Sequence, residues 1–140
     1  MASFVPPGAW WARIFSLEVE EILKNKSVLI VEDEPLTRQM LARILSFRVG
    51  EVIVAANGKE GLELFHSRNP DIILSDLEMP VMNGADMIRA IRQVSPDKPI
   101  VVITAFDDDE HLACEADCVL VKPIFKKELL GVLAAVAQKL

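Results

Sequence analysis

The sequence has few cysteines, no excess of positive charge and no long hydrophobic run. Its two cysteines, Cys114 and Cys118, form no ligand pattern with the histidines His66 and His111, which favours reduced thiols over a metal pair. A net charge of −6 at pH 7 argues against direct nucleic-acid binding. No apolar run approaches the roughly 20 residues that cross a bilayer, and the N-terminus lacks a basic signal-peptide region. We therefore expect a cytoplasmic protein without membrane contact.

A short amphipathic pattern precedes the main part of the chain. Apolar residues recur there at helical spacing: Trp11, Phe15, Val19, Ile22 and Leu23. We expect residues 1–26 to form an N-terminal amphipathic helix and linker, followed by one domain over residues 27–140. The apolar stripe could fold back onto that domain or pair with the same helix of a second chain. We favour the homodimer, because a domain already covered by its own helices has no obvious vacant face.

From Ser27 onward, short apolar runs alternate with helical patterns. We interpret five runs as strands, at residues 28–31, 52–54, 72–76, 99–103 and 119–121. In the helical pattern after the third run, Met87, Ile88, Ile91 and Val94 mark the inner face, and Arg89 and Arg92 are expected outside. Strands that alternate with helices form parallel sheets covered on both faces. The sequence therefore predicts a single α/β domain, without a separate output domain.

Chemically distinctive residues follow four of the predicted strands. They are Glu32 and Asp33 after the first, Asp76 after the third, Thr104 after the fourth and Lys122 after the fifth. In an open parallel sheet, ligands bind at the carboxyl ends of the strands. Three carboxylates at one edge repel one another unless a hard cation such as Mg²⁺ lies among them. A carboxylate nucleophile beside Mg²⁺, a lysine and a hydroxyl is suited to phosphoryl transfer.

Each of these residues also has a purely structural interpretation. Asp76 could cap a turn, and the acids from Glu32 to Glu34 could favour the N-terminus of the following helix through its dipole. Thr104 could be an ordinary β-branched strand residue, and Lys122 could be solvated. The functional interpretation gains its weight from finding all of them at strand ends in one chain.

Residues 27–140 resemble the receiver domain of two-component response regulators, in its single-domain form. The matching motifs are residues 28–34, Ser75-Asp76-Leu77-Glu78-Met79-Pro80 with Asn83-Gly84, Ile103-Thr104-Ala105 and Lys122-Pro123. The resemblance implies a flavodoxin-like, doubly wound, five-stranded parallel sheet of order 2-1-3-4-5. It also implies a phosphoacceptor switch that assists its own phosphorylation and dephosphorylation but is not a turnover enzyme.

The resemblance further implies a role for each site residue. Asp76 would receive a phosphoryl group from a sensor histidine kinase or a histidine phosphotransfer protein. Asp33, Asp76 and the backbone carbonyl of Glu78 would bind Mg²⁺ directly, and Glu32 would act through water. Thr104 and Lys122 would contact the phosphoryl group. The signal would then pass to an unknown output protein by protein–protein contact.

Two departures from the family concern the output face. The interval between Thr104 and Lys122 is short by roughly one helical turn, so we expect a shortened fourth helix. Val119 stands where an aromatic residue usually changes rotamer on activation. These departures leave open a receiver-fold binding scaffold or a phosphate sink. A phosphatase or mutase that uses an aspartate nucleophile is disfavoured, because Glu78 replaces the second aspartate that such enzymes usually carry.

Overall fold

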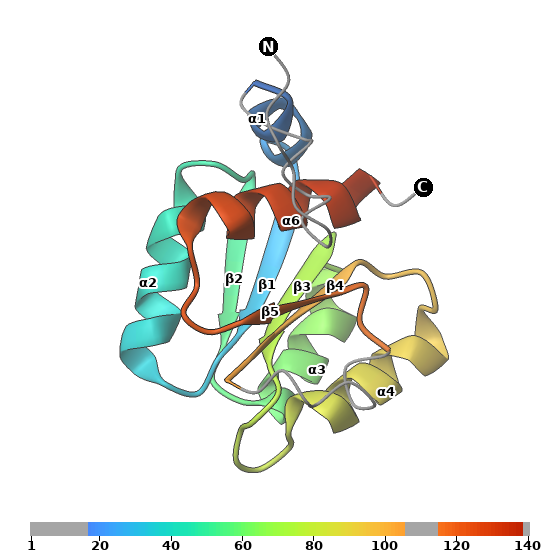
Figure 1. The fold of residues 1–140 in the computed structure, drawn as a ribbon. Helices are drawn as coiled ribbons and strands as arrows, with labels where there is room; N and C mark the ends of the chain where they lie inside the picture. The colour runs from blue at the N-terminus through green and yellow to red at the C-terminus, as the bar shows by residue number, and fades with distance from the viewer. Residues whose placement is uncertain (1–16, 106–114, 139–140) are drawn as a thin grey trace.

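The predicted parallel sheet is present in the computed structural model, which describes residues 17–105 and 115–138 (Figure 1). Five strands pair in the order β2-β1-β3-β4-β5, as predicted. Their bounds are β1 Ser27–Val31, β2 Glu51–Ala55, β3 Ile72–Asp76, β4 Ile100–Thr104 and β5 Cys118–Val121. The helices are α1 Leu17–Leu23, α2 Pro35–Ser46, α3 Gly58–Arg68, α4 Gly84–Val94 and α6 Lys126–Gln138.

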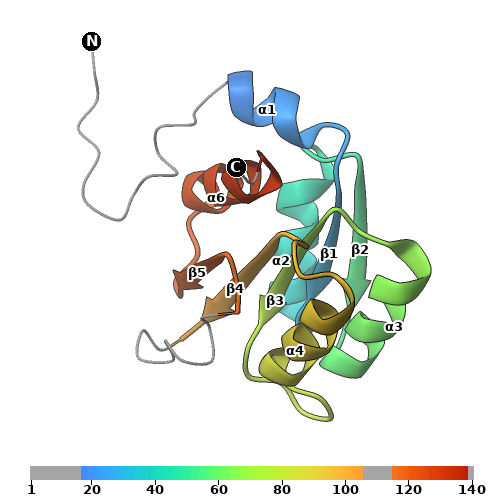
Figure 2. The same cartoon turned by 90° about the vertical axis from the view of Figure 1, so that its right-hand side faces the viewer.

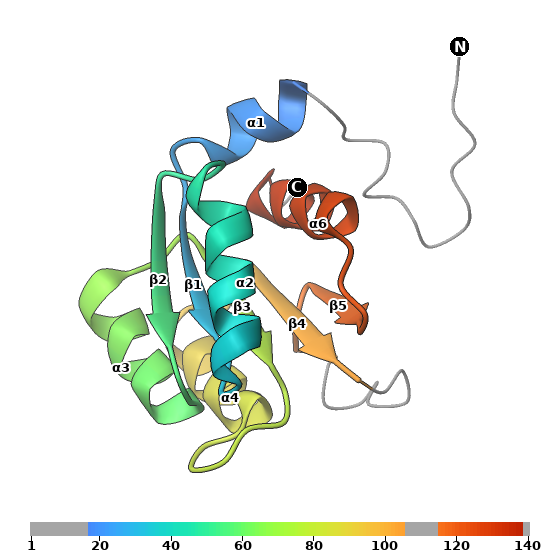
Figure 3. The same ribbon diagram turned by 90° about the vertical axis from the view of Figure 1, so that its left-hand side faces the viewer.

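Helices cover both faces of the sheet (Figures 2 and 3). Side chains alternate along each strand, so a single strand supplies apolar residues to both faces. In β1, Val28 and Ile30 pack with the residues of α2 and α6, whereas Leu29 and Val31 pack with those of α3 and α4. This double burial explains why the strands read as continuous apolar runs in the sequence.

Side-chain caps start three helices directly after the strands. The side chains of Glu34, Asn57 and Asn83 accept hydrogen bonds from backbone N–H groups three residues later, at 2.7, 2.9 and 2.9 Å. Each cap satisfies a backbone donor that the first helical turn leaves without a partner. The caps fix α2, α3 and α4 close to the carboxyl ends of β1, β2 and β3.

Helix α1 packs on its own domain, which is the first of the two arrangements expected for the apolar stripe. Val19 and Leu23 are buried in the same core cluster as Leu129 and Leu133 of α6, and Ile22 packs against that cluster. The domain thus has a face for this helix, contrary to the expectation that its own helices leave none vacant, and the homodimer stays a prediction. Of the predicted stripe, Trp11 and Phe15 lie outside the described residues.

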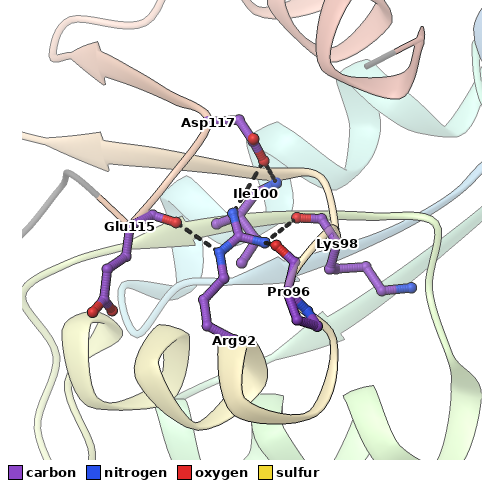
Figure 4. A network of polar contacts seen from close by, with 6 residues as sticks. All are labelled: Arg92, Pro96, Lys98, Ile100, Glu115 and Asp117. Carbon is purple, nitrogen blue, oxygen red and sulfur yellow. Dashed lines mark hydrogen bonds and ion pairs between the residues drawn. The ribbon is translucent and has the colours of Figure 1, made fainter. Parts of the chain in front are cut away.

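Arg92 lies inward rather than outward, at the C-terminal end of α4 (Figure 4). Its guanidinium donates hydrogen bonds to the backbone carbonyls of Pro96, Lys98 and Glu115, at 3.0, 2.6 and 2.8 Å. It also forms an ion pair with Asp117 at 3.2 Å. One side chain therefore ties α4 to the loop before β4 and to the chain that enters β5. Val94, expected inside, is exposed instead.

The entry to β5 is also tied to β4 through its backbone. The amide of Asp117 donates to the carbonyl of Ile100 at 2.8 Å, and the Asp117 carboxylate accepts from the amide of Ile100 at the same distance. At the other end of the strand, Val121 pairs with Thr104. The predicted shortened helix between β4 and β5 falls within residues 106–114, outside the described part of the chain.

Candidate functional site

Three carboxylates meet at the carboxyl edge of the sheet. Asp76 is the last residue of β3, and Glu32 and Asp33 follow β1. The two strands are neighbours, with Val31 paired to Ser75. As a result, Glu32, Asp33 and Asp76 each offer an oxygen within 4.8 Å of the other two. The structure therefore brings together the three acids that the sequence placed at strand ends.

Lys122 reaches the same cluster from β5. Its Nζ lies 3.4 Å from Oδ2 of Asp76. Its backbone amide donates to the carbonyl of Thr104 at 2.8 Å, which continues the β4–β5 ladder past the end of the strand. Thr104 is buried at the end of β4, and β4 lies between β3 and β5. Strand order and register thus set the lysine beside the central aspartate.

Local hydrogen bonds hold Asp76 in place. The amide of Glu78 donates to Oδ1 of Asp76 at 3.3 Å, and the Ser75 hydroxyl donates to the Asp76 carbonyl at 2.8 Å. The Asp76 side chain is 8% exposed, so neighbouring groups cover most of its surface. Sequence reasoning did not identify the Ser75 contact or the Glu78 amide, because both depend on the turn that the chain makes after β3.

Glu32 is the most deeply buried acid of the cluster, with 2% of its surface exposed. Burial, which penalises the charged form, raises its pKa to about 8, and a hydrogen bond to Asp76 and the negative charge of Asp76 add to the effect. Among the described residues, its Oε2 has no hydrogen-bond partner. A buried carboxylate oxygen without a partner, beside two further carboxylates, fits a hard divalent cation.

Gly84 allows α4 to approach the acidic cluster. A Cβ atom at this position would lie 2.2 Å from the Asp76 carbonyl oxygen and 2.9 Å from Cα of Leu77, both parts of the backbone. The Gly84 amide donates to the Leu77 carbonyl at 2.9 Å. The Asn83-Gly84 pair indicated a turn in the sequence, but the sequence did not show that the glycine lies against the chain that carries Asp76.

The family model described as the response regulator receiver domain matches residues 28–134. The response regulator MprA of Mycolicibacterium vanbaalenii is 36% identical over 116 residues, which are 80% of this chain and 50% of that protein. The probable transcriptional regulator ycf27 of Guillardia theta is 38% identical over 127 residues, 88% of this chain and 49% of that protein. The chain thus spans about half the length of these curated relatives.

Solved structures of response regulators have the same fold as this chain. The response regulator TrrA from Thermotoga maritima, determined with Mg²⁺ and BeF, is 32% identical at a TM-score of 0.75; the match covers 79% of this chain and 98% of TrrA. The chemotaxis response regulator CheY4 of Vibrio cholerae is 34% identical at a TM-score of 0.74, with 81% and 99% covered.

Two further findings bear on the class of protein. Within the described residues, no helix has the length and apolar character needed to cross a membrane. The flavodoxin-like order of the strands, predicted from the sequence, is that of the receiver-domain neighbours. Receiver domains are phosphorelay signalling switches that work with histidine kinases, bind Mg²⁺ at an acidic pocket and are generally not turnover enzymes. The acidic cluster at the sheet edge, the strand order and the family match together identify the chain as a member of the response regulator receiver domain family.

Proposed function

We propose that Asp76 accepts a phosphoryl group from a phosphohistidine of a sensor kinase or a histidine phosphotransfer protein in the cytoplasm. The observation that carries this proposal is the cluster of Glu32, Asp33 and Asp76 within 4.8 Å, with the Lys122 ammonium 3.4 Å from Asp76. Asp76 is the central member, because it belongs to the carboxylate group and also faces the lysine.

The proposed reaction forms one bond and breaks one. A carboxylate oxygen of Asp76 attacks phosphorus, the new O–P bond forms, and the P–N bond to the donor imidazole breaks with its electron pair left on nitrogen. The Lys122 ammonium offsets negative charge on the phosphoryl oxygens, and the Thr104 hydroxyl donates to one of them. The Glu78 amide keeps the nucleophile oriented while the group is transferred.

The acids would hold Mg²⁺ through Asp33, Asp76 and the backbone carbonyl of Glu78, with Glu32 acting through water. When bound, Mg²⁺ neutralises the carboxylates and the charge on the transferred group. The partnerless oxygen of Glu32 supports this assignment, because such an atom is costly to bury without a cation or water nearby. A carbonyl is a suitable Mg²⁺ ligand, so the backbone of Glu78 adds an oxygen without adding charge.

Exposed apolar side chains that lie close to the site residues in the sequence support docking of a donor protein. Leu36, Val81 and Phe125 are 73%, 80% and 63% exposed. Each follows a site residue within five positions along the chain: Leu36 after Asp33, Val81 after Asp76 and Phe125 after Lys122. We expect a donor protein to cover these apolar side chains while it delivers the phosphoryl group. The phosphorylated chain then signals to an output protein by contact.

The test is phosphorylation by a small donor. Acetyl phosphate with Mg²⁺ should add one phosphoryl group to the chain, as read by intact-protein mass spectrometry, and the Asp76→Asn variant should take up none. Asp86→Asn is the matched control, because Asp86 is an exposed acid paired with Arg89 outside the cluster. Labelling that persists in Asp76→Asn rejects the assignment. A chain that binds partners without ever being phosphorylated is a scaffold instead.

A further inference from the structure

Arg38 lies in the first turn of α2, beside the chain that links β1 to this helix. Its guanidinium nitrogen Nη1 donates a hydrogen bond to the backbone carbonyl of Glu32 at 2.8 Å. The same nitrogen lies 3.5 Å from the carbonyl oxygen of Asp33, in a second and longer contact. One side chain thus holds the backbone carbonyls of both acids that follow β1.

Other contacts fix the two ends of this turn. The amide of Glu32 donates to the carbonyl of Ala55 at 3.0 Å, which continues the pairing of β1 with β2. The amide of Arg38 donates to the carbonyl of Glu34 at 2.9 Å, and the Glu34 side chain caps α2. The turn is therefore anchored before and after Asp33, and the guanidinium of Arg38 reaches the carbonyls between these anchors.

Arg38 contacts the backbone of the acidic cluster rather than its carboxylates. Among the described residues it forms no ion pair, whereas Lys122 is paired with Asp76. Both contacts of its side chain go to carbonyl oxygens, and the side chain is half-buried, so water competes less for its donors. A hydrogen bond from a charged donor is roughly twice as strong as one between neutral groups. Arg38 is thus suited to holding the turn.

We propose that Arg38 is a positioning residue for the Mg²⁺ ligands, an inference that rests on the proposed function. The Cα atom of Asp33 lies in the chain between the two carbonyl groups that contact Nη1 of Arg38. Fixing both carbonyls therefore fixes the direction in which the Asp33 carboxylate leaves the backbone. Mg²⁺ demands near-ideal octahedral geometry, so its affinity depends on how well such a carboxylate is held.

The charge of Arg38 and its hydrogen bonds have opposite effects on Mg²⁺ binding. A guanidinium near the cluster repels a divalent cation, so removal of the charge alone should tighten Mg²⁺ binding. Removal of the hydrogen bonds frees the turn that carries Asp33, so the ligand has to be ordered when the cation binds, and binding weakens. Arg38→Met removes the charge and the donors but keeps an unbranched apolar stem. The sign of the change in the Mg²⁺ dissociation constant therefore decides between the two effects.

The experiment is a Mg²⁺ titration of the ¹⁵N-labelled full chain, followed by the amide shifts of residues 32–34 and 76–78. In Arg38→Met the dissociation constant should rise about tenfold, as expected when a metal ligand loses the group that orients it. Arg38→Lys keeps the charge on a compact, strongly hydrated ammonium, and its dissociation constant should rise roughly threefold. The matched control is Arg43→Met, at an exposed arginine in the last turn of α2, which should leave the constant nearly unchanged.

A second measurement separates positioning from the chemistry of phosphoryl transfer. Near the Mg²⁺ dissociation constant of the original chain, acetyl phosphate should phosphorylate Arg38→Met slowly. At saturating Mg²⁺ the rate should return close to that of the original chain, because Arg38 holds the backbone and meets no reacting atom. If Asp76→Asn is still phosphorylated, the proposed function fails, whereas the Mg²⁺ titration still decides the role of Arg38.

Three outcomes would overturn the proposal. Tighter Mg²⁺ binding in Arg38→Met would show that charge repulsion outweighs positioning. An unchanged dissociation constant in the Arg38 variants, with a lower urea midpoint, would make the contact purely structural. A phosphorylation rate that stays low at saturating Mg²⁺ would place Arg38 in the transfer step itself. If Arg38→Met does not fold, Arg38→Lys decides alone, because its charge is that of the original chain and an unchanged dissociation constant then rejects the positioning role.

Discussion

The replacement Asp33→Asn tests the charge balance of the acidic cluster most directly. Asn keeps the size and shape of the side chain and removes one negative charge. Without a divalent cation, the variant should unfold at higher urea concentration than the original chain, because like charges in the cluster repel one another. With saturating Mg²⁺ the order should reverse, because the original chain gains a bound cation and the variant has lost a ligand.

The expected magnitude follows from the geometry of the cluster. Two unit charges 4.8 Å apart repel by about 3.5 kcal/mol at an effective dielectric constant of about 20. Two effects reduce this value: Lys122 offsets part of the charge on Asp76, and Asp33 is only half-buried and therefore screened by solvent. We expect Asp33→Asn to add about 1–2 kcal/mol to the free energy of unfolding without Mg²⁺.

The stabilisation of the folded state by Mg²⁺ also has an expected magnitude. A ligand present at about 100 times its dissociation constant stabilises the folded state by about 2.7 kcal/mol. The original chain should show a gain of this size, and Asp33→Asn should show little of it. Asp86→Asn serves as the control, because its exposed carboxylate lies outside the cluster and should leave the Mg²⁺ response unchanged.

The assay is urea unfolding followed by far-ultraviolet circular dichroism, with EDTA or with excess Mg²⁺. The decisive result is that Asp33→Asn is more stable than the original chain in EDTA and less stable than it in excess Mg²⁺. If Asp33→Asn is less stable than the original chain in EDTA, repulsion among the acids is not a substantial cost. If its Mg²⁺ response equals that of the original chain, Asp33 is not a metal ligand.

Three further variants test other contacts. Gly84→Ala should destabilise the fold by about 1–3 kcal/mol in urea unfolding and slow phosphorylation by acetyl phosphate. The reason is that the new methyl group meets the backbone of the strand that carries the nucleophile. Unchanged stability and an unchanged phosphorylation rate would contradict the close approach. Arg92→Ala should cost about 2–4 kcal/mol, because three backbone carbonyls lose a charged donor and Asp117 loses its ion pair. Arg89→Ala should cost under about 1 kcal/mol, because its ion pair is exposed, and equal losses in the two variants would refute the difference. Lys122→Ala should keep most of the Mg²⁺ stabilisation but slow phosphorylation, and a loss of Mg²⁺ response as large as in Asp33→Asn would show that the lysine is misassigned.

Strand order made much of the site predictable from the sequence. In a parallel sheet all strands end at one edge, so an acid after β1, an acid at the end of β3 and a lysine after β5 must lie near one another. Their chemistry could then be inferred without coordinates. Distances within the cluster, and the burial of Glu32 that raises its pKa, could not be inferred because they depend on side-chain packing.

A sequence pattern identifies the apolar face of a helix but not the element that packs against this face. The stripe that contains Val19 and Leu23 indicated burial, yet periodicity could not show that α6 provides the covering surface. The charge of Arg92 predicts a side chain in solvent. A long side chain with several donors can instead bend toward the carbonyls that a helix end and its loop leave unsatisfied, and hydrophobic periodicity does not register such donors.

The anchoring of β5 has a consequence for how this domain tolerates changes in length. Lys122 is set beside Asp76 by the pairing of Val121 with Thr104, and Arg92 holds the start of the strand through Glu115 and Asp117. None of these contacts involves residues 106–114. We therefore expect the lysine to keep its place when residues between β4 and β5 are inserted, removed or exchanged. On this expectation the β4–β5 connection is a suitable position for inserting a reporter peptide.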